Sequence, residues 1–138
     1  EHKTLLILEQ ALVYLELNNK KVIRVGLPES GEGINEYLSQ IHHPALKHKL
    51  HSAIALKLLK KIIRECSCKH DIEICVNNKR LSEYRGHCNE NLHALREIFG
   101  DKKITIKCDN RVDLNSVAIN LDKENLHFLR QELLRELY

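Results

Sequence analysis

The stretch of residues 44–66 most constrains the fold, because it reads as the longest helix in the chain. At 100° per residue its apolar side chains fall on one side of the helix, which predicts a core beneath it. That apolar side consists of Ile54, Ala55, Leu58, Leu59, Ile62, Ile63 and Cys66. The opposite side carries a basic stripe, made of Lys57, Lys60, Lys61 and Arg64.

The basic stripe has two interpretations. It is either a solvated face, whose lysine stems cover apolar neighbours, or a surface that binds the phosphates of a nucleic acid. Leu46, Leu50 and Ala53 point toward the same side as the stripe. This predicts that the first turns contact a different element or that the helix bends.

Composition indicates one domain spanning residues 1–138, with 43% hydrophobic residues and a formal charge of +3. Five cysteines, an odd number, favour reduced thiols and a cytoplasmic protein over a disulfide framework. The apolar runs are much shorter than the roughly 20 residues that span a bilayer. We therefore expect no membrane partner.

Two hairpins are predicted from alternating side chains around asparagine pairs. The first pairs residues 13–17 with 21–25 around Asn18-Asn19, although residues 4–12 fit a helix nearly as well. The second pairs residues 72–76 with 79–84 around Asn77-Asn78. Because the two turn sequences are similar, residues 13–42 and 72–99 suggest a weak hairpin-and-helix repeat, with chance similarity as the alternative.

Further strands are predicted at residues 102–108 and 117–121, and further helices at 34–41, 89–99 and 122–137. The predicted fold class is therefore α+β. It comprises a mostly antiparallel sheet built from hairpins and packed by the long central helix and the C-terminal helix.

The segment Gly86-His87-Cys88-Asn89, with the predicted helix 89–99 and the strand 103–107 after it, resembles the second half of KH-type RNA-binding domains. In that family a Gly-x-x-Gly loop precedes a helix and a strand, and the loop backbone approaches single-stranded nucleic acid. Two features depart from the family pattern. Asn89 replaces the last glycine, and a predicted strand stands where the family has a helix before the loop.

We identify no catalytic residue, metal site or cofactor from the sequence, which favours a non-catalytic protein over an enzyme. The first functional hypothesis is a self-associating interaction module that contacts a protein partner through apolar faces. Its candidate interface residues are Leu46, Leu50, Leu126, Leu129, Leu133 and Leu137. The second is a single-stranded RNA or DNA binder that uses Lys57, Lys60, Lys61, Arg64, Arg85 and Gly86. The small number of aromatic residues, four Tyr and two Phe, favours the first hypothesis.

Overall fold

The computed structural model describes residues 2–23, 25, 45–66 and 70–138. The helix predicted at residues 34–41 lies outside the described residues. The described helices are α1 (His2–Leu17), α3 (Leu46–Cys66), α4 (Leu81–Arg85), α5 (Glu90–Ile98) and α6 (Arg130–Leu137), with short 3-10 helices η1 (Asn78–Arg80) and η2 (His87–Asn89). The strands are β1 (Ile72–Val76), β2 (Ile104–Cys108), β3 (Ser116–Asn120) and β4 (Asn125–Leu129).

The four strands form one sheet in the order β2-β1-β3-β4, and the α+β class is confirmed. The pairs β1–β3 and β3–β4 are antiparallel, whereas β1–β2 is parallel, so the sheet is mixed. Parallel neighbours need a crossover connection, which α4 and α5 supply between β1 and β2. Among the described strands, β3 and β4 alone are joined as a hairpin.

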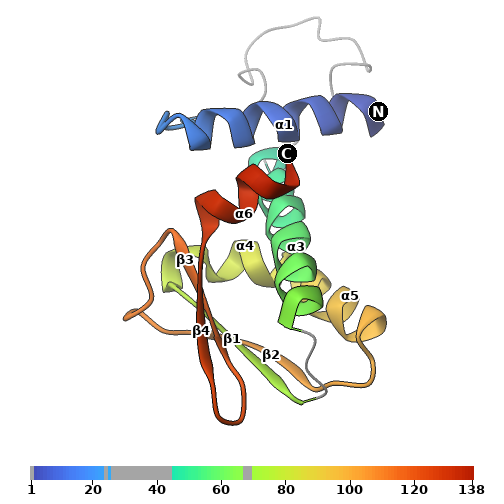
Figure 1. Ribbon diagram of the computed structural model, residues 1–138. Coiled ribbons are helices and arrows are strands. Elements are labelled where there is room, and N and C mark those ends of the chain that lie inside the picture. The colour runs from blue at the N-terminus through green and yellow to red at the C-terminus, as the bar shows by residue number, and fades with distance from the viewer. Residues whose placement is uncertain (1, 24, 26–44, 67–69) are drawn as a thin grey trace, which may run out of the picture.

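The helices gather on one face of the sheet, and α1 lies across the end of the molecule where α3 begins and the chain ends (Figure 1). The apolar side predicted for residues 54–63 is buried in the core. It meets Ile72, Ile74 and Val76 of β1, which are fully or almost fully buried. Leu46 and Leu50 are also buried, in the same cluster as Leu12 and Val13 of α1. The first turns of α3 thus contact a different element, as one of the two alternatives predicts.

The first predicted hairpin is wrong, because residues 13–17 belong to α1. Asn18-Asn19 ends this helix instead of turning a hairpin. The Lys20 amide donates to the Leu15 carbonyl at 2.8 Å, the Asn19 amide donates to the Glu16 carbonyl at 3.1 Å, and Asn19 has φ of 56°. This is the Schellman arrangement that closes a helix with a left-handed residue.

Only the first strand of the second predicted hairpin is confirmed, as β1. The second strand is wrong, because residues 79–84 form parts of η1 and α4. Asn77 caps η1, since its side-chain oxygen accepts from the Lys79 amide at 3.1 Å. The suggested repeat therefore has different structures in its two copies at residues 13–17 and 72–76. Residues 26–42 of the first copy lie outside the described part of the chain.

The C-terminal helix is shorter than predicted, because residues 125–129 form β4 and α6 starts at Arg130. The Leu121 amide donates to the Glu124 carbonyl at 2.8 Å and closes the turn that brings β4 against β3. The predictions of α3, α5, β1, β2 and β3 are confirmed. None of the described helices has an apolar stretch long enough to cross a membrane.

Candidate functional site

The two acidic residues of α1 both point toward the protein interior. Glu9 is buried, and its carboxylate accepts from the Lys57 ammonium and from the Tyr138 hydroxyl. Glu16 accepts from the Arg130 guanidinium, with 3.2 Å between Nη2 and Oε2. Ion pairs and hydrogen bonds from α3 and α6 therefore hold α1 in place, in addition to its apolar contacts.

The exposed side of α1 carries several large apolar side chains beside the polar Thr4 and Gln10, which is unusual for the solvent side of a surface helix. Ile7 is 64% exposed and Tyr14 is 67% exposed, and Leu5, Leu6 and Ala11 are exposed as well. Leu5 lies on the side of buried Glu9 and Leu12, so we call the other four residues, Leu6, Ile7, Ala11 and Tyr14, the α1 patch. A helix that is hydrophobic on nearly every side is normally covered, so the α1 patch is a candidate contact surface.

The candidate interface residues from the sequence are placed in three ways. Leu46, Leu50 and Leu133 are buried in the core of the chain, and Leu126 is partly buried against that core. Leu129 of β4 is exposed. Leu137 is also exposed, in the last turn of α6, which contacts α1.

Acidic side chains of α1, of α6 and of α3 itself partly neutralise the basic stripe. Lys57 pairs with Glu9 of α1. Lys61 pairs with Glu65 at 2.7 Å and with Glu136 of α6 at 2.8 Å. Glu65 is visible in the helical periodicity of α3, but Glu9 and Glu136 come from other elements, and all three acids reduce the positive potential of the stripe.

The loop that resembles the KH motif lies between two helices, α4 and α5. Gly86 has φ of 75° and ψ of 173°, and Asn89 has φ of 61°. Asparagine tolerates the left-handed region better than most residues. The strand predicted before the loop is wrong, because α4 occupies that position.

Arg85 contacts the free edge of β2 instead of the loop. Its Nε and Nη2 donate to the Ile106 carbonyl at 3.3 and 2.7 Å. Arg96 does the same at the Ile104 carbonyl, at 3.2 and 3.1 Å. Two guanidinium groups thus satisfy carbonyls that an edge strand otherwise leaves open to pairing.

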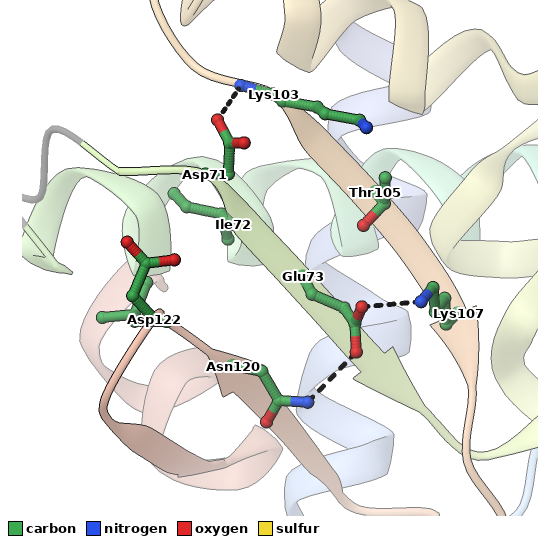
Figure 2. Close-up of a pocket in the computed structure, with 9 residues that line it drawn as sticks. Asp71, Ile72, Glu73, Lys103, Thr105, Lys107, Asn120 and Asp122 are labelled. Atoms are coloured by element: carbon green, nitrogen blue, oxygen red, sulfur yellow. Dashed lines mark hydrogen bonds and ion pairs between the residues drawn. The ribbon is translucent and has the colours of Figure 1, made fainter.

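The outward face of the sheet bears a polar pocket of about 460 Å³ (Figure 2). Figure 2 shows Glu73 between Lys107 and Asn120, with 2.7 Å to the Lys107 ammonium and 3.2 Å to the Asn120 amide. These hydrogen bonds hold the pKa of Glu73 below its ordinary value. Asp71 accepts from the Lys103 amide at 3.1 Å. The polar groups drawn there largely satisfy one another, so we do not assign the site to this pocket.

The cysteines of the described residues are free thiols, namely Cys66, Cys75, Cys88 and Cys108. Burial, together with the neighbouring Glu73 carboxylate, raises the pKa of the Cys75 thiol, so this group is a poor nucleophile at neutral pH. Within the described part of the chain, no group of three or more His, Cys, Asp or Glu side chains is placed to hold a metal ion. Cys68 lies outside that part.

A buried charge network joins four helices, and sequence reasoning misses it. Arg130 is 0% exposed and also donates to the Tyr84 hydroxyl at 3.1 Å. Arg80 lies 3.8 Å from Glu16 and donates to Glu83 at 3.1 Å. Burial alone would raise the pKa of Glu16, but the hydrogen bond and charge of Arg130 outweigh it and the pKa is lowered. The one local signal in the sequence is an acid, Glu16, within an apolar stretch.

Comparison of the chain with protein-family models, with curated proteins and with solved structures gives no match. The function is therefore argued from the residues and their geometry.

Proposed function

We propose that the chain is a non-catalytic, self-associating interaction module, in which the α1 patches of two copies contact each other. The observation that carries the proposal is the exposure of large apolar side chains along α1. Its acids face inward and its exposed side carries large apolar groups. Leaving such a surface in water is unfavourable by about 25 cal/mol for each Å² of apolar area.

A second copy is the partner that fits this surface best. Between Thr4 and Leu15 the exposed positions of α1 carry no charged side chain, so two patches meet without like-charge repulsion. A helix of 16 residues is about 24 Å long. An antiparallel pair would place Leu6 and Ile7 of each copy near Tyr14 of the other, which is the self-complementary arrangement of a two-fold dimer.

The free thiols support a reducing compartment, and we place the module in the cytoplasm for that reason. A regulatory role in that compartment fits a protein that binds a partner without transforming a substrate.

Light scattering coupled to size exclusion tests the proposal over a wide concentration range. We expect a dimer mass for the wild type, and a monomer mass for Ile7→Glu and Tyr14→Glu, because a charge on each patch would be buried beside its copy. Ile98→Glu is the matched control, since Ile98 is an exposed isoleucine on α5. A wild-type monomer at every concentration contradicts the proposal, as does dissociation by the control.

Binding of single-stranded nucleic acid is the second candidate function, favoured by the position of the 86–89 loop between two helices. His87, Cys88 and Asn89 are exposed there, and Lys60 and Arg64 belong to the basic stripe. Anisotropy of a labelled oligonucleotide at several salt concentrations tests it. Under this function, binding weakens with salt and falls when Lys57, Lys60, Lys61 and Arg64 become Glu. If this variant binds the oligonucleotide as tightly as the wild type, the basic stripe does not take part in nucleic-acid binding.

A further inference from the structure

A second pocket, of about 320 Å³, lies where the end of α1 and the segment after it meet the start of α3, η1 and α4. It differs from the sheet pocket of Figure 2 in its charge. Five cationic residues line it, together with His51 and two acids. The cations are Lys20, Lys21, Lys47, Lys79 and Arg80.

The two similar sequences of the chain meet at this pocket. Asn18-Asn19-Lys20-Lys21 and Asn77-Asn78-Lys79-Arg80 are far apart in the sequence, yet both of their basic pairs line the pocket. In each segment the asparagines set the backbone just before the cations. Asn19 closes α1, and Asn77 caps η1. The shared sequence therefore has a shared consequence, which is two pairs of cations directed to one place.

The positive charge of the pocket is not balanced by its acids. Glu16 pairs with Arg130 behind the pocket. Arg80 pairs with Glu83 and lies 3.8 Å from Glu16, so the uncompensated charge of the pocket is that of its lysines. The lysines at Lys20, Lys21 and Lys79 have no ion pair with any other described residue. Lys47 donates to the Val22 carbonyl at 2.7 Å, a neutral partner that leaves its charge uncompensated.

Two buried polar atoms at the pocket lack a partner among the described residues. They are Nε of Arg80 and Nδ1 of His51. An unpaired buried polar atom is unfavourable by about 1–3 kcal/mol, so the wall of the pocket is under-satisfied at these two positions.

We propose that this pocket binds the phosphoryl or diphosphoryl group of a small organic phosphate. The group carries two or more negative charges and several acceptor oxygens, which match the four lysines that line the pocket. The pocket volume is at the lower end of the range for small-molecule sites. The cations surround a hollow, whereas a nucleic-acid surface would spread them along a track. This inference is independent of the proposed self-association.

Calorimetric titration with inorganic pyrophosphate and with ADP, in buffer with physiological salt, tests the inference. We expect saturable binding, weakened at least about tenfold in the double variant Lys20→Gln/Lys79→Gln, since each lost charge removes a direct contact. The control is Lys49→Gln/Lys123→Gln, which removes the same charge from exposed positions outside the pocket. We expect less than a twofold change in the control, and circular dichroism confirms that both variants are folded.

Any one of four results would overturn the inference. The first is no binding of either probe by the wild type at millimolar concentration. The second is equal binding by the pocket variant and the control. The third is equal competition by sulfate, which would indicate an adventitious ion only. Tighter binding of an oligonucleotide than of ADP, lost in the pocket variant, would assign the cations to a nucleic acid and likewise reject the small phosphate.

Discussion

Arg130, the first residue of α6, forms a two-point ion pair with Glu16 of α1, although 114 positions separate them in the sequence. The same guanidinium donates to Tyr84 of α4 and lies 5.9 Å from the centre of its ring. One buried side chain therefore joins three helices.

Replacing Arg130 by Met should destabilise the protein by about 3–5 kcal/mol, because it leaves the Glu16 carboxylate half-buried without its main partner. The double variant Arg130→Met/Glu16→Gln should recover part of this loss, since the uncompensated charge is gone. Urea unfolding of the two variants measures the difference. If Arg130→Met unfolds at the wild-type urea concentration, the pair does not stabilise the fold.

His51 should make stability fall as the pH drops below about 6.5. Burial lowers the pKa of this imidazole in the folded protein, and the charges of Glu83, Glu16, Arg130 and Arg80 all act on it. Because the unfolded chain binds the proton more readily, protonation favours unfolding from the unfolded pKa down to the folded one. Stability from this residue is fully present above pH 6.5.

The measurement is the melting temperature between pH 7.5 and 5, for the wild type and for His51→Gln. We expect a flatter curve in the variant. His48→Gln is the control on the same helix, and it should follow the wild-type curve. Parallel curves for all three proteins would exclude His51 as the source of the pH dependence.

Removing the two arginines at the edge of β2 should lower stability and promote aggregation. Arg85→Ala and Arg96→Ala each leave one carbonyl without its donor, at a cost of about 1 kcal/mol. The open edge can then pair with another chain. Chemical denaturation and thioflavin fluorescence measure the two effects. Lysine at both positions should restore only part of the lost stability, because its ammonium lacks the planar guanidinium group that donates from two nitrogens to one carbonyl.

Gly86→Ala should destabilise the protein by about 1–3 kcal/mol. The backbone at Gly86 has φ of 75°, and an added Cβ would lie 2.6 Å from Cγ of Glu90 and 3.1 Å from the Asn91 amide nitrogen. The glutamate can move, but the backbone of α5 cannot move as easily. Gly100→Ala is the control, because its nearest contact is 3.3 Å, to the Arg96 carbonyl. Thermal unfolding of both variants decides whether the loop needs this glycine.

The sequence predicts correctly the elements that have a long periodic pattern of apolar residues, or a short alternating pattern next to clear turn residues. The helix at residues 46–66 has an apolar stripe over many turns, and β1, β2 and β3 alternate within a few residues of clear turns. Apolar and other side chains also alternate at residues 13–17. The helix around them is apolar on nearly all sides, so its sequence shows no clear helical period of apolar residues. Residues 125–129 fit a helical spacing, yet pairing with β3 outweighs that local pattern.

The candidate sites were harder to predict, because their residues meet only in the folded chain. No local feature indicates that Glu16 pairs with Arg130, or that Glu9 neutralises Lys57 of the basic stripe. The similarity between Asn18-Asn19-Lys20-Lys21 and Asn77-Asn78-Lys79-Arg80 is visible in the sequence. Its meaning as one cationic pocket depends on how α1 packs against η1.

The position of α1 also bears on the order in which the molecule assembles. Its polar contacts to Arg130 and Tyr138 join residues more than 110 positions apart in the sequence, so these contacts form only when α6 is in place. Contacts between distant residues form late because the intervening chain must first be ordered. Amide hydrogens of the first helix are therefore expected to exchange with deuterium while those of α3 remain protected.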